Sequence, residues 1–208
     1  MSALLPVPKR LSAKLCVDAS ARLQAASLVP VFHGWISKQA VDEVLIDVVD
    51  YSHVLHGPAL MLVALEADYV LDEGDGVTGI RYIRKRAMPQ SLVGAVAQVI
   101  LQATRAALLL AEAPELDPPV VFDATRIEVE LLDKLHYPAT SAELEEALAV
   151  VADAVYPGSF TIIAVPDDPR RPLRFVIQHD GVGSLASVVN HLETSAILHT
   201  AFSPALSA

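Results

Sequence analysis

Hydrophobic and polar residues alternate along the chain from 11 to 18. Successive side chains of a strand point to opposite faces, so this period of two residues is typical of a half-buried β-strand. We therefore predict a strand over 11–18. Apolar residues then recur at helical spacing from Leu28 onward, and Pro30 suits the first turn of a helix. This second pattern predicts a short helix over 28–39.

Three runs rich in β-branched residues come next, at 44–51, 59–73 and 79–86. Their composition and length predict three strands. The sequence DEGDG separates the last two runs, and this combination of glycine and aspartate favours a tight turn. We therefore predict that the last two strands form a hairpin.

The longest apolar stretch covers residues 91–113 and predicts a helix. Its polar residues Gln98, Gln102 and Arg105 fall on one narrow stripe, and the other sides of the helix are apolar. Charged side chains facing lipid are costly, so we predict a buried helix and no membrane span. A single sheet cannot cover such a helix, so a second apolar layer must come from the other half of the chain or from a second copy. Of these two we favour the second copy, which predicts a homodimer.

The second half of the chain has a similar order of elements. We predict a strand over 125–135, followed by a helix in which Thr140 and Glu143 have the spacing of a capping box. Two further strands are expected at 159–165 and 173–179, with a turn-rich connector between them. A last amphipathic helix follows these strands.

These elements predict an α+β fold. The halves 9–113 and 120–199 each contain a strand, a helix, two or more strands and a second helix. We interpret this order as a structural pseudo-repeat within a single domain that covers residues 1–208. Adjacent hairpins imply antiparallel pairing, so we expect antiparallel sheets with helices packed on one face.

Composition and charge exclude several classes of partner. The 208 residues include 25 acidic and 15 basic side chains, which give a net charge of −10. This charge opposes binding to nucleic acid and to anionic membrane surfaces. The single cysteine, Cys16, cannot form an internal disulfide, and the first residues lack the pattern of a signal peptide. We therefore expect a cytoplasmic protein that binds neither nucleic acid nor membrane.

The stretch DYSHVLHGP, residues 50–58, is the first candidate for chemistry. It contains Asp50, Tyr51, His53 and His56 in a predicted loop between two strands. Imidazole and carboxylate are common metal ligands, so Asp50, His53 and His56 are candidates for a metal site. The glycine and proline that end the stretch favour the simpler interpretation, a solvated turn in which Asp50 caps backbone amides.

Charges of opposite sign occupy neighbouring segments of the first half. Nine carboxylates and no Lys or Arg occur between residues 39 and 80, and Glu66 is one of the nine. The sequence RYIRKR follows directly and contains Arg81 and Arg84. We expect the two blocks to pair across the hairpin. The alternatives are an acidic surface for a cation or a basic partner, and an anion held by Arg81 and Arg84.

The predicted helix over 28–39 offers a further candidate surface. Trp35 lies on its apolar face and is expected to be buried in the core, whereas His33 lies at the edge of that face. The alternative is a binding cleft between this helix and the loop at 50–58. The complete set of candidate ligand-binding residues is His33, Trp35, Asp50, Tyr51, His53, His56, Glu66, Arg81 and Arg84.

Motifs of common enzymes are absent from the sequence. It contains no GxSxG, HExxH or CxxC, and the glycines of DGVGSLAS do not complete a dinucleotide-binding fingerprint. We therefore predict a protein that acts by association, through self-assembly or by docking to a partner, and that needs no cofactor. The alternative is a small metal- or ligand-dependent enzyme or binding protein, with a site around His33, the 50–58 loop and Glu66.

Overall fold

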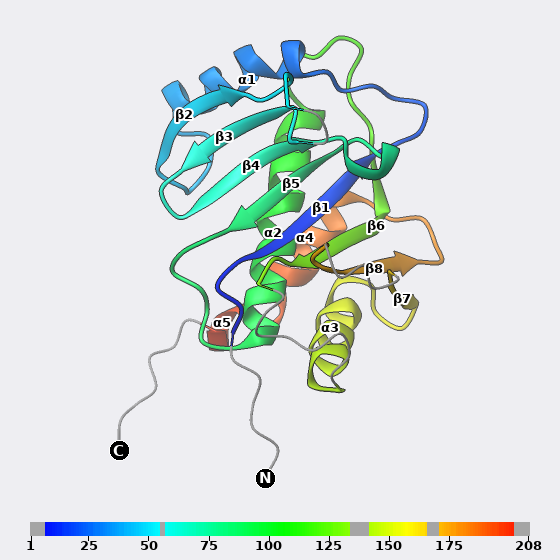
Figure 1. Ribbon diagram of the computed structural model, residues 1–208. Helices are drawn as coiled ribbons and strands as arrows, with labels where there is room; N and C mark the ends of the chain where they lie inside the picture. The colour runs from blue at the N-terminus through cyan, green and yellow to red at the C-terminus, as the bar shows by residue number, and fades with distance from the viewer. Residues whose placement is uncertain (1–6, 55–56, 134–141, 166–170, 202–208) are drawn as a thin grey trace.

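In the computed structural model, residues 7–54, 57–133, 142–165 and 171–201 are described. Eight strands in these segments form one antiparallel sheet in the order β2-β3-β4-β5-β1-β6-β8-β7 (Figure 1). The strands are β1 (Leu11–Val17), β2 (Leu45–Asp50), β3 (Leu60–Ala64), β4 (Ala67–Asp72), β5 (Gly79–Arg84), β6 (Phe122–Leu131), β7 (Phe160–Ala164) and β8 (Leu173–His179). The α-helices of the described segments are α1 (Ala25–Lys38), α2 (Leu92–Ala111), α3 (Ala142–Val155), α4 (Leu185–Thr194) and α5 (Ala196–Ala201), and a short 3-10 helix, η1 (Gly74–Gly76), lies between β4 and β5. The expected α+β class with antiparallel pairing is confirmed.

The first strand joins the two halves of the chain into one sheet. β1 pairs with β5 on one side and with β6 on the other, antiparallel in both cases. We had expected separate sheets, because the sequence shows which segments are strands and not which strands pair. The capping box predicted at Thr140 lies outside the described residues, and α5 was not predicted.

The helices pack on one face of this sheet. α1 contacts β2 and β3, α2 contacts β1, β5 and β6, and α3, α4 and α5 surround α2. Figure 1 shows α2 passing behind the sheet, with α4 and α5 on the same side. The opposite face carries no α-helix in the described segments. The core lies between the sheet and the helices and contains alternate residues of the central strands, such as Leu11, Ala13 and Leu15 of β1.

One predicted strand is two strands in the structure. The segment 59–73 divides into β3 and β4, which pair with each other across a short turn at Leu65 and Glu66. This turn contains no glycine or proline, so no local signal in the sequence marks it. Ala64 and Ala67 on either side of it are both buried in the core. Even-numbered residues of β3 and odd-numbered residues of β4 therefore face the helices, and the single strand predicted over 59–73 is wrong.

Helix α2 is buried within the chain. Its length and composition alone would allow it to cross a membrane, but 67% of its most apolar window is buried in the structure, as in the core helix of a globular protein. The layer over its outer side comes from α3, α4 and α5. The second apolar layer is therefore intramolecular, and our argument for a dimer through this helix is wrong.

This packing predicts the effect of a charge in α2. Leu101 is 6% exposed, so Leu101→Glu would bury a carboxylate without a partner and should destabilise the fold by about 3 kcal/mol or more. We expect a large fall in the urea midpoint or complete unfolding. The control Val150→Glu, at an exposed position of α3, should stay within about 1 kcal/mol of wild type. A folded Leu101→Glu protein of near wild-type stability would contradict the intramolecular burial of α2.

Candidate functional site

The helix-free face of the sheet carries a row of charged side chains. Directly opposed residues of paired strands point to the same face of a sheet. The strand register places Val70, Arg81, Lys14, Glu128 and Val176 next to one another, in this order, across β4, β5, β1, β6 and β8. Three charged residues therefore occupy the middle of the row, with apolar residues on both sides.

The charged residues of this row are buried. Lys14 is 1% exposed, Glu128 is 2% exposed and Arg81 is 7% exposed. Burial of a charge costs several kcal/mol unless an opposite charge and hydrogen bonds compensate for it. The ion pairs and hydrogen bonds described below are therefore a requirement of the fold.

Arg81 connects strands on both sides of it. Its Nε and Nη2 lie 2.7 and 2.6 Å from Oδ2 of Asp72 on β4. Its Nη1 lies 2.8 Å from Oε2 of Glu130 on β6 and donates to the hydroxyl of Ser12 at 3.0 Å. Lys14 approaches Asp72 to 3.3 Å and donates to the carbonyl of Val77. The expected pairing of the acidic and basic blocks is confirmed at this position.

Glu128 lies among arginines from three strands. Its Oε1 accepts a hydrogen bond of 2.9 Å from Arg126, while its Oε2 lies 4.0 Å from Arg81 and 3.8 Å from Arg174. That Oε2 is buried and has no hydrogen-bond partner among the described residues.

Burial and the nearby Glu128 raise the pKa of Cys16 to about 11, so this thiol stays protonated at neutral pH and is a poor nucleophile.

The two carboxylates that hold Arg81 have pKa values shifted in opposite directions. Burial opposes the ionisation of Asp72, but the charges of Arg81 and Lys14 outweigh it and lower the pKa of Asp72 below its usual 3.8. Burial raises the pKa of Glu130, and the attraction of Arg81 does not cancel this effect. Asp72 is therefore the more firmly ionised partner of Arg81.

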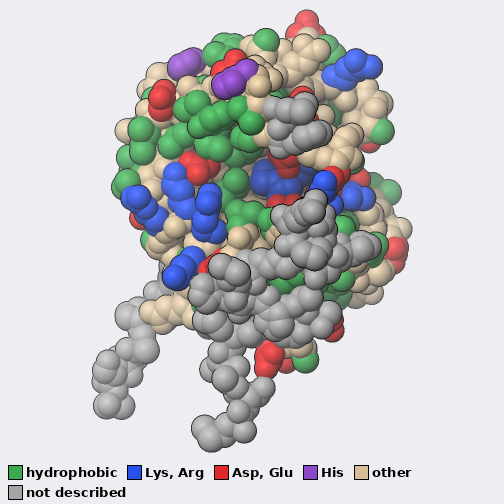
Figure 2. All heavy atoms as spheres, in the orientation of Figure 1, with side chains coloured by type: hydrophobic (Ala, Val, Ile, Leu, Met, Phe, Trp, Pro, Cys, Tyr) green, Lys and Arg blue, Asp and Glu red, His purple; other side chains and the backbone are tan. Residues whose placement is uncertain are grey.

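A wide groove of about 1350 Å³ lies over this part of the sheet. Its floor contains Met61, Val70 and Ile83 from β3, β4 and β5, next to Arg81. The described residues of its walls belong to the loop between β2 and β3, to the turn between β4 and β5, and to the segment that leads into β8. Figure 2 shows hydrophobic side chains over β3 and β4 on this face, above a band in which basic and acidic side chains alternate.

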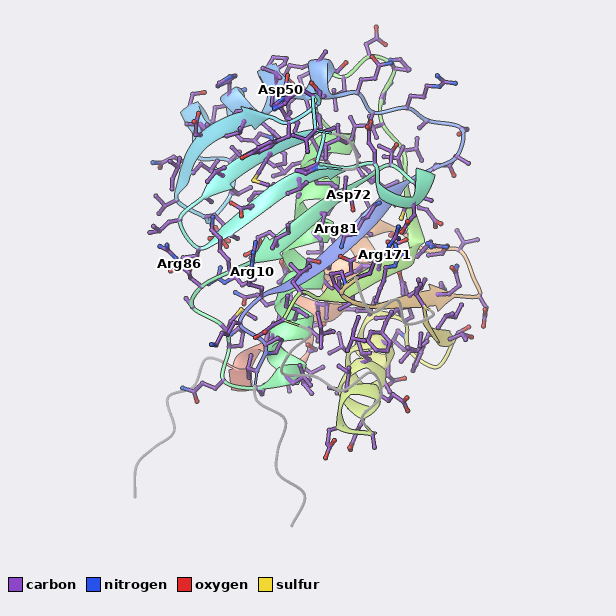
Figure 3. The ribbon with its side chains drawn as sticks, viewed as in Figure 1. Arg10, Asp50, Asp72, Arg81, Arg86 and Arg171 are labelled. Carbon is purple, nitrogen blue, oxygen red and sulfur yellow. The ribbon has the colours of Figure 1, made fainter. Side chains whose placement is uncertain are left out.

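Asp75 links two walls of the groove. It lies in the turn between β4 and β5 with φ of 57°, a left-handed conformation that aspartate adopts more readily than most residues. Its carboxylate binds Nη1 of Arg171 at 2.6 Å and also pairs with Nη1 of Arg174 on β8. Hydrogen bonds from Arg171 and Arg174 lower its pKa. Figure 3 shows Asp72 and Arg81 in the middle of the sheet, with Arg171 nearer to β8.

The structure separates several residues of the predicted ligand-binding set. Tyr51 and Arg81 both line the groove. Trp35 is buried in the core against Tyr69, with the ring centroids 5.9 Å apart, so the interpretation as a core residue is confirmed. His33 is exposed on α1. A single cleft that contains His33, Trp35 and the loop at 50–58 is therefore not formed.

Arg84 lies on the opposite face of the sheet from Arg81. Residues three apart in a strand point to opposite faces, so the two arginines cannot share one anion. Arg84 pairs with Glu43 at 2.7 Å and with Glu66 at 2.6 Å, and the hydroxyl of Tyr82 also donates to Glu43. The alternative of one anion held by both Arg81 and Arg84 is therefore wrong.

The loop at 50–58 forms a turn at its start. Oδ1 of Asp50 accepts a hydrogen bond from the amide of Ser52 at 2.8 Å, as the simpler interpretation of this stretch predicts. The ring of His53 stacks on the ring of Tyr51, with the ring centroids 6.4 Å apart. His56 lies outside the described residues. Within the described part of the chain, no three His, Cys, Asp or Glu side chains form a group that could hold a metal ion.

Sequence reasoning missed a second, smaller pocket of about 240 Å³ at the start of α4. It is lined by His179 and His191, whose Nδ1 atoms lie 2.6 and 2.9 Å from the backbone carbonyls of Ser159 and Val155. A neutral imidazole that donates from Nδ1 has its Nε2 as an acceptor. The two histidines are twelve positions apart in the sequence, in a strand and in a helix, so no spacing rule relates them.

The glycines before α4 have a structural role. A Cβ on Gly183 would lie 2.8 Å from the carbonyl oxygen of Ala124, so only glycine allows the loop to pack this closely on β6. Ser184 caps α4 by accepting a hydrogen bond from the amide of Ser187. The glycine and the serine of DGVGSLAS therefore serve loop packing and helix capping.

Comparisons with known proteins do not assign this groove to a function. No protein-family model matches the chain, and a search of curated proteins gives no match. The chemistry of the groove must therefore be argued from its own residues.

The lowered pKa of Asp72 predicts a dependence of stability on pH. A carboxylate whose pKa is lower in the folded state stabilises the fold above its unfolded pKa, and this contribution is lost as pH falls through the folded value. Asp72→Asn should therefore be less stable than wild type at pH 7, and the difference should shrink below about pH 4. Urea unfolding from pH 7 to pH 3 measures it, with Glu145→Gln on the exposed side of α3 as the control. A difference that stays constant over this range would contradict the role of Asp72.

Proposed function

We propose that this chain is a cytoplasmic, non-catalytic binding protein that holds a polypeptide segment of a partner protein in the groove on the helix-free face of the sheet. The observation that carries the proposal is the groove itself, which combines an apolar floor with a charged wall whose side chains are fixed by one another. A wall that is ordered before binding does not lose side-chain freedom when a partner docks.

The size of the groove favours a polypeptide over a small molecule. Pockets for small ligands are typically about 300–1,000 Å³ and bury most of the ligand surface. This groove has a larger volume, about 1350 Å³, and extends over several strands. An extended or helical peptide is the natural occupant of a long open groove.

The charges of the groove indicate which peptide fits. Its described lining contains four carboxylates and three arginines, namely Asp72, Glu73, Asp75, Glu130, Arg81, Arg171 and Arg174. Arg81 contacts Asp72, Glu130, Glu128 and Ser12, and Arg174 contacts Asp75, Glu128 and Glu130. The chain as a whole carries a net charge of −10. We therefore propose a partner segment with apolar side chains for the floor and a net positive charge.

A pseudo-repeat within the chain forms part of this proposal. In each half, the first strand pairs with the strand that precedes the second main helix, which gives the pairs β1 with β5 and β6 with β8. β1 and β6 also pair with each other at the middle of the sheet. This arrangement supports two related halves, 9–113 and 120–199, that meet at β1 and β6. The groove lies mainly on the first half.

Selection from a displayed library of random twelve-residue peptides tests the proposed function. Wild-type protein should enrich peptides that combine apolar residues with Lys or Arg. Met61→Glu changes the groove floor and should weaken binding of the enriched peptides by about tenfold or more. Val150→Glu places the same substitution on exposed α3, away from the groove, and should leave binding unchanged.

Two results would contradict this function. One is that wild-type protein enriches no peptides beyond those that the Met61→Glu protein enriches. The other is that wild-type protein enriches acidic peptides. The alternative function is a metal- or ligand-dependent protein. Native mass spectrometry of protein purified without chelator distinguishes it, because a stoichiometric metal or small molecule would favour that alternative.

A further inference from the structure

The two edge strands of the sheet differ in how they are protected from further pairing. β2 and β7 lie at opposite ends of the sheet (Figure 1). β2 carries Asp47 and Asp50, and a register shift between Leu45 and Asp47 interrupts its pairing. Charged residues and bulges are the usual devices that prevent an exposed edge from pairing with another chain. β2 therefore has the features of a blocked edge.

β7 has none of these features. Its sequence FTIIA contains no charge and no proline, and it pairs with β8 in a continuous register from Phe160 to Ala164. Its outer side pairs with no described strand. Ile163 is 49% exposed although isoleucine is among the residue types most often buried. A regular, uncharged and hydrophobic edge is the kind that accepts another strand.

The hydrogen bonds of β7 define which backbone groups point outward. The amide of Val165 donates to the carbonyl of Arg174 on β8. Backbone groups of an antiparallel strand alternate in direction, so Ile163 and Thr161 also face β8. The amide and carbonyl groups of Phe160, Ile162 and Ala164 therefore point away from the sheet.

These outward groups are complementary to a second copy of themselves. We propose that two copies of the chain join through antiparallel pairing of their β7 strands, with Ile162 of each copy opposite Ile162 of the other. This register places Phe160 opposite Ala164 of the second copy, so outward groups meet outward groups at all three positions. It replaces the dimer that we expected through α2, and it is independent of the peptide groove.

The proposed dimer has a defined geometry. Its twofold axis passes through the paired Ile162 residues, perpendicular to the sheet. The helices of both copies then lie on one face and the two grooves on the other. Thr161 of each copy lies beside Ile163 of the other on the groove face, which covers the exposed isoleucine.

The net charge of the chain predicts how the dimer responds to salt. Each copy carries a net charge of −10, and the contact strand is uncharged. Repulsion between the copies therefore opposes association and is screened as the ionic strength rises. The dimer should become tighter with added NaCl, whereas binding of a basic peptide in the groove should become weaker.

A matched pair of double variants tests both the surface and its register. In the variant Thr161→Lys with Ile163→Lys, each introduced lysine lies opposite a lysine of the second copy, and the dimer dissociation constant should rise by about tenfold or more. In the variant Thr161→Glu with Ile163→Lys, the opposed residues have opposite charge, and the constant should stay within about threefold of wild type. Both positions are exposed, so both variants should keep wild-type melting temperatures.

Light scattering from 1 to 500 µM reads out the result. The proposal expects wild type to approach twice the chain mass of 22.2 kDa, the double-lysine variant to remain near one chain mass, and the charge-paired variant to follow wild type. Wild type that remains monomeric throughout, or a double-lysine variant that dimerises like wild type, would overturn it. Hydrogen exchange of wild type gives a check without variants. The amides of Ile162 and Ala164 should exchange more slowly at high protein concentration, and rates independent of concentration would also overturn the proposal.

Discussion

The requirement that buried charges find partners organises the helix-free face of this protein. Arg81, Lys14 and Glu128 occupy the central strands and are almost inaccessible to solvent. None of them could remain charged there alone, because each would lose its hydration without compensation. Their partners come from β4, β5, β6 and β8. These three residues and their charged partners, which we call the charged layer, therefore connect segments that are far apart in the sequence. The layer also forms one wall of the groove, so the same contacts that hold the sheet give the candidate site its shape.

The central position of β1 explains why the layer can form. β1 lies between β5 and β6 in the sheet. Its residues alternate between the two faces: Leu11 and Leu15 point into the core, and Lys14 points into the charged layer. The halves of the chain meet at this strand. Loss of a contact within the layer therefore affects pairing on both sides of β1, and we regard the groove and the sheet as one cooperative unit.

The elements could be predicted from the sequence because their signals are local. Alternation gave β1, β-branched runs gave β2, β5, β7 and β8, and apolar periodicity gave α1 and α2. The turn at Leu65 and Glu66 has no local signal, so the prediction merged β3 and β4 into one strand. The position of β1 between β5 and β6 depends on pairing over long distances, which composition does not encode. The candidate site was only partly predicted for the same reason, since Asp75 and Arg174 meet across about a hundred residues of chain.

The coupling energy between Arg81 and Glu130 tests the central claim, that the charged layer supports the sheet and the groove, most directly. A double-mutant cycle with Arg81→Met and Glu130→Gln, measured by urea unfolding at pH 7, should give about 1.5 kcal/mol or more, because the pair is largely buried. The same cycle for Arg105 and Asp42, an exposed pair of α2 and the segment before β2, should give less than about 1 kcal/mol. Equal and small coupling in both pairs would contradict the account, since the charged layer would then contribute no more than an ordinary surface ion pair.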